Sequence, residues 1–539
     1  MIVAGCGGES NGATPLAVVS GAPLAAAPIQ NPAEPEETLA QAIAEAYESN
    51  PSLLAQRYDL RAIDDELGAA LAGVRATIKA EISAGYKFTN PGDITQASRP
   101  LVDRLNSPYI HDNDLSSQFV IDQPLSTGGK ASAEIAAARG DIRAAREKLR
   151  GNEGDLLLDI ITAYVDIRRD TEALAIRTSN EAALAATLDE VSARREAGEL
   201  TRTDIAQAMT QLQLARTLRN NAEAQLENSR SIFAALIGHY PGRLALEPTL
   251  PDMPHSIDEA FDIASHLNPD LAAAIEGERA SRSRIASARA EGRPVLAARG
   301  IAGTVGPVSP FHGYNQDLYW SGRLTLSVPL SAGGRTSAAI SQALDRNNAD
   351  RLRIEEARRR VVQQLVAAWN QLITARRNVA AQEEQFKAAQ IYYEGTFEEY
   401  RAGLRSTFDV LYAQSSLRES EVALLGSKRD QYVAQASALR QLGRLEIRNL
   451  LVAPNPYDAA AHIKTVEARG ALPWDPLFRA IDRVGKPGES QRRQGPLVAD
   501  QVQPELVKGS GRELPLALVK GSPTPTTGKS NAPAGVKQP

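Results

Sequence analysis

Two long stretches without proline dominate the chain, at residues 127–197 and 331–402, and both follow a helical hydrophobic pattern. Apolar side chains recur in them at every seventh position, which is the spacing of a coiled-coil seam. The seam positions are Ile135, Ile142, Leu149 and Leu156 in the first stretch and Leu365, Leu372, Val379 and Phe386 in the second. With about 70 residues each, the two stretches predict helices of roughly 100 Å.

A glycine follows each of these stretches and predicts a reversal of the chain. Return helices begin after Gly198 and Gly403 and run to about Leu236 and Leu442. The hydrophobic pattern therefore predicts two helical hairpins, with helices far longer than those of ordinary globular domains.

Strand-like alternation precedes each hairpin. Between Ile78 and Phe88 the apolar side chains occupy even positions and the polar ones mostly odd positions, and residues 318–330 alternate in the same way. Weaker candidates run over residues 119–125 and 295–305. Period two with one apolar face indicates a half-buried strand, so we expect four strands per chain. Because an open strand edge is not tolerated at membrane depth, strands that face lipid would need several chains to complete one barrel.

Shorter helical segments open each half of the chain. The first covers residues 36–76 and contains Asn50-Pro51, where we expect a break, since proline suits the first turn of a helix and not its interior. A matching segment starts near Ser256 and contains Asn268-Pro269.

The same landmarks recur at one fixed offset of 205 residues. They are Pro124–Lys130 and Pro329–Arg335, Gly198 and Gly403, Asp204 and Asp409, and Gly238 and Gly443. This regularity indicates a tandem duplication. We therefore divide the chain into a leader or disordered arm (1–35), a first repeat (36–250), a second repeat (251–450), a short helical segment (451–484) and a disordered tail (485–539).

Composition narrows the classes of function. Aromatic residues make up only 5% of the chain, which suits closely packed long helices more than a large globular core. The net charge is −5 with both signs interspersed, so nothing points to a nucleic-acid partner. No run of 18 apolar residues predicts a transmembrane helix, although membrane strands need only about 9–11 residues.

No constellation of residues predicts an enzyme. The six histidines lie far apart without the spacing of metal ligands, and the Gly-Gly pairs lack the Lys-Ser/Thr ending of a phosphate-binding loop. We expect no catalytic site, no metal and no cofactor.

The only cysteine, Cys6, follows Ile2-Val3-Ala4-Gly5, which resembles the acylation signal of bacterial lipoproteins. The five residues before it cannot supply the basic and apolar regions of a signal peptide. Either the true start lies upstream and Cys6 is lipidated, or the match is accidental. A rival cleavage site lies near Leu24–Ala27, and either version predicts export.

The order helix, strand, strand, long helical hairpin, repeated twice, resembles the TolC family of bacterial outer-membrane channel proteins over about residues 36–450. Its marks are Asn50-Pro51-Ser52-Leu53, Asn268-Pro269-Asp270-Leu271, the paired Pro-Leu-Ser-x-Gly-Gly segments and the two Ala-Gly tips. The segment Tyr457–His462 also resembles type I secretion members of that family.

The resemblance implies a mostly α-helical fold with a membrane β-barrel. Three chains would each give four strands to one barrel in outer-membrane lipid, and their hairpins would form a trimeric α-barrel in the periplasm. The implied partners are a periplasmic membrane-fusion adaptor and an inner-membrane transporter. The implied function is a passive exit duct of a type I secretion or efflux system, and the Asn-Pro marks and residues 457–462 favour secreted protein over drugs as cargo.

The resemblance also assigns a gate to the hairpin tips. It implies that Tyr400 and Arg405 tie the second hairpin to the first through Thr203 and Asp204. It implies that Asp409 projects into the pore, where three chains would supply a ring of carboxylates that favours cations.

One position departs from the family pattern, because Tyr412 stands where some members carry a second pore aspartate. We expect cation binding at the gate to be weaker or differently shaped, with constriction by aromatic rings as an alternative. The docking surface for the adaptor is expected at the turns, at Gly198, Leu200, Gly403 and Leu404.

Simpler interpretations stand beside these roles. Asp204 and Asp409 fall in the first turn of a return helix, where a carboxylate suits the helix dipole. Arg405 could be a solvated surface charge, and the glycines ordinary turn residues. A coiled-coil scaffold or adaptor without a pore is the alternative function, although such a protein has no need of the amphipathic strands.

Overall fold

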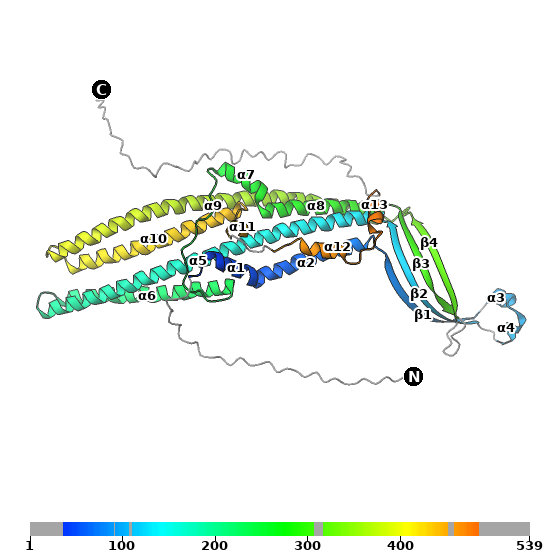
Figure 1. Cartoon of the computed structure of the whole chain (residues 1–539), viewed down its shortest axis with the longest axis horizontal. Coiled ribbons are helices and arrows are strands. Elements are labelled where there is room, and N and C mark those ends of the chain that lie inside the picture. Colours follow the sequence, from blue (N-terminus) through cyan, green and yellow to red (C-terminus); the bar gives the residue numbers. More distant parts are fainter. Residues whose placement is uncertain (1–35, 91, 107–109, 307–315, 451–456, 485–539) are drawn as a thin grey trace, which may run out of the picture.

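The computed structural model describes residues 36–90, 92–106, 110–306, 316–450 and 457–484 (Figure 1). The predicted leader, the predicted disordered tail and Cys6 lie outside these residues. The molecule is elongated, with a β-sheet at one end and the tips of two long helical hairpins at the other.

The first repeat follows the predicted order of helix, strand, strand and hairpin, with two short helices between the strands that the sequence pattern did not indicate. Its elements are α1 (Leu39–Ser49), α2 (Pro51–Ala72), β1 (Thr77–Thr89), α3 (Asp93–Ser98), α4 (Leu101–Asn106), β2 (Ile110–Ser126), α5 (Lys130–Glu196) and α6 (Arg202–Ile237).

The second repeat has the same order, and three short helices follow it. Its elements are α7 (Ile257–Leu267), α8 (Pro269–Ala290), β3 (Val295–Gly306), β4 (Asp317–Ser327), α9 (Arg335–Arg401) and α10 (Thr407–Gln441). The helices that follow are α11 (Ile447–Leu450), α12 (Ala461–Ala468) and α13 (Asp475–Val484). Within the described residues, no helix is both long enough and apolar enough to cross a membrane.

The two long helices contain 67 residues each, and their predicted seams face the protein. Ile135, Ile142 and Leu149 are buried on α5, and Leu365 and Leu372 are buried on α9. Towards the tip of α9 the seam residues Val379 and Phe386 are only half-buried. The heptad pattern therefore identified the packed face of both helices, with tighter packing away from the tip.

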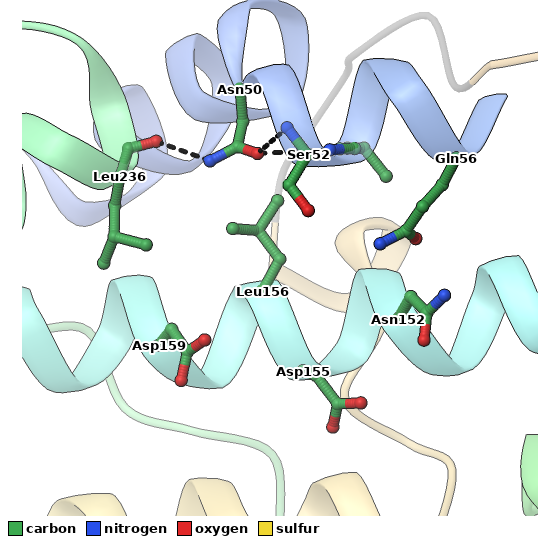
Figure 2. Close-up of a pocket in the computed structure, with 9 residues that line it drawn as sticks. Asn50, Ser52, Gln56, Asn152, Asp155, Leu156, Asp159 and Leu236 are labelled. Carbon is green, nitrogen blue, oxygen red and sulfur yellow. Dashed lines mark hydrogen bonds between the residues drawn. The ribbon is translucent and has the colours of Figure 1, made fainter. Parts of the chain in front are cut away.

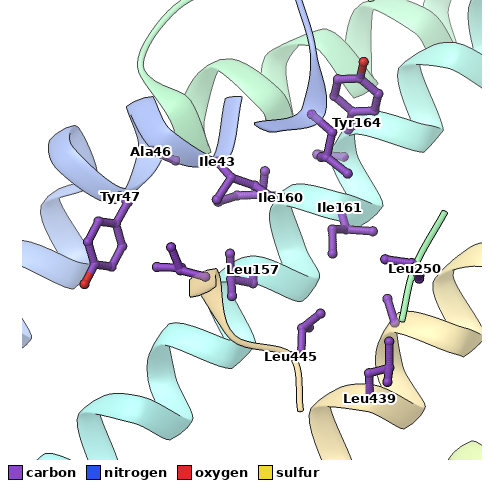
Figure 3. Packing of buried hydrophobic residues seen from close by; sticks show 14 of the residues in the cluster. Ile43, Ala46, Tyr47, Leu157, Ile160, Ile161, Tyr164, Leu250, Leu439 and Leu445 are labelled. Atoms are coloured by element: carbon purple, nitrogen blue, oxygen red, sulfur yellow. The ribbon is translucent and has the colours of Figure 1, made fainter. Parts of the chain in front are cut away.

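The main hydrophobic core lies at mid-length, where both hairpins meet the short helices (Figure 3). Ile43 of α1, Leu157 and Ile161 of α5 and Leu439 of α10 are buried together there. The fully buried Tyr164 places its hydroxyl 3.0 and 2.8 Å from the carbonyl oxygens of Glu37 and Ala245. This core joins the two repeats, so neither hairpin packs by itself.

The four strands form one antiparallel sheet in the order β1-β2-β3-β4, which leaves β1 and β4 at its edges. Strand β2 begins earlier than its hydrophobic pattern predicted, because it pairs with β1 from Ile110 onward. Strand β4 ends at Ser327, so Val328 and Leu330 of the predicted apolar face lie beyond the strand. Backbone pairing sets these ends, and side-chain alternation does not report it.

The two faces of the sheet differ sharply in polarity. Cross-strand pairing puts Phe119 and Trp320 on one face, on which Ile82 also lies, and all three are exposed apolar side chains. On the opposite face Arg299 forms an ion pair with Asp122 at 2.6 Å, and hydrogen bonds join Gln118 to Glu81 and to Tyr319. One face is therefore suited to an apolar environment and the other to water.

Candidate functional site

The tip of the first hairpin is a glycine turn followed by a capped helix. Gly198 takes a left-handed conformation with φ of +83°, which lets α5 end and the chain reverse. Thr201 and Asp204 then form a capping box, in which the Thr201 hydroxyl accepts from the Asp204 N–H and the Asp204 carboxylate accepts from the Thr201 N–H at 2.8 Å. These bonds from Thr201 hold the pKa of Asp204 below its ordinary value.

The tip of the second hairpin repeats this construction. Gly403 has φ of +78°, and Ser406 and Asp409 form the capping box of α10. The Ser406 hydroxyl and N–H donate to the Asp409 carboxylate at 2.8 and 3.1 Å and hold the pKa of Asp409 below its ordinary value. The local interpretation of Asp204 and Asp409 as first-turn carboxylates is confirmed, and their place in a pore stays a prediction.

A single polar link joins the two tips in the described chain. The Arg194 guanidinium on α5 donates to the Tyr400 hydroxyl on α9 at 2.7 Å, and lies 5.6 Å from the centre of the Tyr400 ring. The resemblance had assigned Tyr400 to Thr203 and Asp204. In the structure Tyr400 reaches the first hairpin through Arg194, and the Asp204 carboxylate accepts from Thr201. The role of Tyr400, Thr203 and Asp204 in a gate stays a prediction.

Arg405 also has a different partner from the one expected. Its guanidinium donates to the Glu399 carboxylate of the same hairpin at 2.7 Å, and both side chains are half exposed. Within one chain it therefore closes the turn of its own hairpin. Thr203, on the first hairpin, is exposed.

Aromatic and apolar side chains crowd the second tip. Phe408 and Tyr412 stack on α10 with ring centres 6.3 Å apart, and Tyr412 is 60% exposed. Leu404 in the turn is exposed as well. The positions 205 residues earlier hold Thr203, Gln207 and Glu199, so the first tip has no such surface.

The arginine side chains that link the hairpins grow more exposed from the core towards the tips. Arg440 of α10 donates to Asp155 of α5 at 2.6 and 3.0 Å with its side chain only 7% exposed. Arg429 donates to Asp166 at 2.7 and 3.0 Å with its side chain 22% exposed. The Arg194 side chain at the tip is 39% exposed. Since exposure weakens an ion pair or hydrogen bond, the tip link is the easiest of these to break.

Between these levels the hairpins also share buried contacts. Leu411 of α10 is buried in a cluster with Leu184 of α5 and Leu212 of α6. One turn further on, the Gln414 amide donates to the buried Asn180 at 3.2 Å. The second hairpin is therefore seated on the first almost to its end.

The two Asn-Pro marks tie the short helices to the return helices. The side-chain oxygen of Asn50 caps α2 by accepting from the N–H groups of Ser52 and Leu53. Its side-chain amide donates to the Leu236 carbonyl of α6 at 2.9 Å (Figure 2). Figure 2 also shows Asn152, Asp155 and Asp159 of α5 lining the small pocket beneath this cap.

Asn268 makes the same contacts in the second repeat. It caps α8 by accepting from Asp270 and Leu271, and its amide donates to the Gln441 carbonyl of α10 at 2.9 Å. The marks that carried the family resemblance thus have a structural role, which fixes where each return helix ends.

A buried clamp at the start of α5 was not among the features predicted from the sequence. Asp482 of α13 is fully buried and accepts from the N–H groups of Thr127 and Ser132 at 2.6 and 3.0 Å and from both of their hydroxyls. Burial by itself would raise the pKa of Asp482, but the hydrogen bonds from Ser132 and Thr127 outweigh it and lower the pKa.

An ion pair completes this clamp. Arg75, which precedes β1, donates to Asp475 of α13 at 3.1 Å, and both side chains are buried. Arg75 also donates to the carbonyl oxygens of Arg469 and Glu467. The amphipathic pattern of residues 474–484 indicates a helix with one packed face, but it does not say where that face packs.

The chain matches a protein-family model described as "Outer membrane efflux protein" over residues 42–239 and 261–444. It is 27% identical over 433 residues to the outer membrane efflux protein BepC of Brucella suis, covering 80% of this chain and 91% of BepC. It is 25% identical to the alkaline protease secretion protein AprF of Pseudomonas aeruginosa, covering 57% and 66% of the two chains. Its fold is similar to that of the Campylobacter jejuni CmeC outer membrane channel, with a TM-score of 0.67 at 14% identity and coverage of 80% and 89%.

Proposed function

The chain belongs to the outer membrane efflux protein family, a family of bacterial outer-membrane channel proteins, and from that premise we propose that it is a passive, trimeric exit duct of a tripartite secretion or efflux system. In this proposal the transporter of the inner membrane supplies the energy and a periplasmic adaptor joins the two. The duct itself supplies a continuous path out of the periplasm.

The observation that carries the proposal is the polarity of the sheet. Its apolar face, with Ile82, Phe119 and Trp320, suits lipid, and its hydrogen-bonded polar face suits a water-filled lumen. The free edges of β1 and β4 cannot remain unpaired in lipid. Three chains that pair β1 of one with β4 of the next would remove every edge and close a barrel, which a scaffold without a pore has no reason to do.

The gate is proposed at the hairpin tips. The Arg194–Tyr400 link lies at the tip end of a series of arginine contacts, in which the arginine side chain is more buried at each step towards Arg440. Opening would break this link and swing the second hairpin away while the Arg440–Asp155 contact stays intact. Asp409 would line the constriction as a ring of carboxylates that favours cations, with the exposed Tyr412 beside it.

The adaptor is proposed to dock on the turns, at Gly198, Leu200, Gly403 and Leu404. Leu404 is 77% exposed at the end of the molecule furthest from the sheet, where a periplasmic partner could reach it. For the cargo, we favour a secreted protein. AprF is named for the secretion of a protease and BepC for efflux, so both cargo classes occur among similar proteins.

Reconstitution of the purified protein in a planar bilayer tests the proposal. We expect small, cation-selective single-channel steps from the wild type. In Arg405→Ser, which removes the partner of Glu399, we expect larger steps if this residue helps to hold the tip closed. A channel of unchanged conductance would remove Arg405 from the gate, and well-folded protein without any channel would favour the scaffold alternative.

A further inference from the structure

Helix α13 buries charged side chains and exposes apolar ones, which is the reverse of a helix on the surface of a water-soluble protein. Its two aspartates, Asp475 and Asp482, are fully buried against the rest of the chain. Three of its apolar side chains point away from the protein, since Leu477 is 60% exposed, Ile481 43% and Val484 89%, while Phe478 is half-buried. Surface helices in water normally bury the apolar stripe and expose the charges.

The buried charges fix this orientation. Asp482 accepts hydrogen bonds from Thr127 and Ser132, and Asp475 is paired with the buried Arg75. Turning the helix to hide its apolar face would leave Arg75 without its carboxylate partner and the start of α5 without its cap, which is costly for buried groups. The apolar face is therefore held outward by the fold.

The clamp also fixes the level of α13 along the molecule. Thr127 directly follows Ser126, the last residue of β2, so α13 lies where the sheet ends and the helices begin (Figure 1). Exposed apolar side chains of the sheet reach the same level, at Ile78, Ile121 and Leu326 near the ends of their strands. In the proposed orientation this level is the periplasmic surface of the outer membrane.

The residues around the apolar face match a lipid surface. Trp474, 47% exposed, directly precedes the helix, and indole rings concentrate at the boundary between headgroups and acyl chains. Arg483 is exposed on the flank of the helix between its apolar and buried faces, where its guanidinium group can meet lipid phosphates.

We propose that α13 is a membrane-interface helix whose apolar face enters the periplasmic leaflet of the outer membrane. This inference rests on the proposed function, because it takes the sheet to span that membrane. Since Asp482 and Asp475 attach the helix to both the β2–α5 junction and the start of β1, its contact with lipid would set the depth at which the sheet sits.

The tryptophans of the chain allow a direct test. Trp320 lies on the apolar face of β4, Trp369 is buried in the main core, and Trp474 borders α13. Two full-length variants would each keep one reporter: Trp320 alone in W369F/W474F, and Trp474 alone in W320F/W369F. Both would be reconstituted in phosphatidylcholine vesicles with bromine either close to the headgroup or deep in the acyl chain, and fluorescence quenching would be measured.

We expect Trp474 to lose several-fold more fluorescence to shallow bromine than to deep bromine, while Trp320 is quenched by lipid in either case. Quenching of Trp320 without quenching of Trp474 would overturn the interface helix and leave the channel proposal standing. A blue-shifted Trp474 without quenching would also overturn it, in favour of a protein partner on this face. If neither is quenched, the membrane-spanning sheet fails, and the interface helix fails with it.

A thiol-labelling test avoids the change at buried Trp369. In a C6S background, Leu477→Cys on the apolar face is compared with Ser265→Cys, an exposed position on α7, away from the sheet. In lipid vesicles we expect Leu477→Cys to react at least several-fold more slowly than Ser265→Cys with a water-soluble maleimide. Equal rates would overturn the proposal.

Discussion

The two strand-to-helix junctions have the same backbone and opposite surroundings. In the first repeat Gly128 and Gly129 have positive φ, and in the second Gly333 and Gly334 do. The first junction is covered by α13, whose Asp482 caps α5. The second junction is exposed, and Leu330 beside it is 95% exposed.

This difference shows what duplication fixes and what it leaves free. The pair of glycines is repeated because both repeats must turn from a strand into a helix. The helix that covers the first junction, α13, is not repeated. It follows both repeats and occurs once among the described residues. The exposed junction follows β4, an edge strand, so in the proposed trimer it lies where the neighbouring chain would pack.

The largest expected effect comes from removing the cap of the first junction. Asp482→Ala leaves the N–H groups of Thr127 and Ser132 buried without an acceptor, and we expect a loss of about 2–4 kcal/mol in the free energy of unfolding. The matched control is Ser337→Ala at the position equivalent to Ser132, where the hydroxyl donates only to the Gly334 carbonyl. Its expected effect is within about 0.5 kcal/mol. Thermal unfolding in detergent measures the stability of both variants. Equal losses in Asp482→Ala and Ser337→Ala would contradict the difference between the two junctions.

The same cap gives the first junction a pH dependence that the second lacks. Because the pKa of Asp482 is lowered in the folded state below 3.8, its stabilisation is complete above that value and is lost as the pH falls through the lowered pKa. Between neutral and strongly acidic pH, the free energy of unfolding should therefore fall less in Asp482→Ala than in the wild type. If the stability of both proteins fell by the same amount at acidic pH, Asp482 would not be the titrating group.

A smaller effect tests a place where the repeats are alike. Asn50→Ala and Asn268→Ala each remove a helix cap and a tie to a return helix, and each should cost about 1–2 kcal/mol. Both asparagines are nearly fully buried, so we expect the two losses to agree. Exposed Ser52, replaced by Ala, serves as the control with little effect. A loss in one variant only would show that the second repeat depends on neighbours for its stability.

The tips give a still smaller effect that concerns opening. Tyr400→Phe removes the hydroxyl that accepts from Arg194, at a cost of about 0.5–1 kcal/mol to the closed state. The open-to-closed ratio should rise about two- to fivefold. Single-channel recording gives this ratio, with Tyr393→Phe on the same helix as the control. A ratio that does not move would exclude the Arg194–Tyr400 link from the gate.

The smallest change concerns the paired capping aspartates. At the N3 position of the capping box an Asn side-chain oxygen can still accept from the N-cap N–H, so Asp204→Asn and Asp409→Asn remove charge with little effect on folding. If only Asp409 lines the constriction, Asp409→Asn alone should reduce cation selectivity, measured as reversal potential across a salt gradient. Because the pKa of Asp409 is lowered, wild-type selectivity should persist until the pH falls below about 3.8. Equal loss in both variants would contradict the assignment.

Local signals predicted most of the fold. Asn-Pro breaks, glycine turns and heptad spacing each act within a few residues, so the ends of α2, α5 and α10 follow from the sequence. The Arg194–Tyr400 link could not be predicted, because either residue alone looks like an exposed side chain on a helix. The Asp482 clamp was missed because its partners lie some 350 residues earlier, and no local pattern reports such a contact.

The clamp also has a consequence for biosynthesis. Arg75 and Thr127 are made early, but their partners Asp475 and Asp482 emerge from the ribosome only after both hairpins have been synthesised. The first junction therefore stays incompletely folded until almost the whole described chain has been synthesised. Contacts this distant in sequence form late and slowly. A chain cut short before α13 would leave Arg75 without its carboxylate partner and the start of α5 without the Asp482 cap.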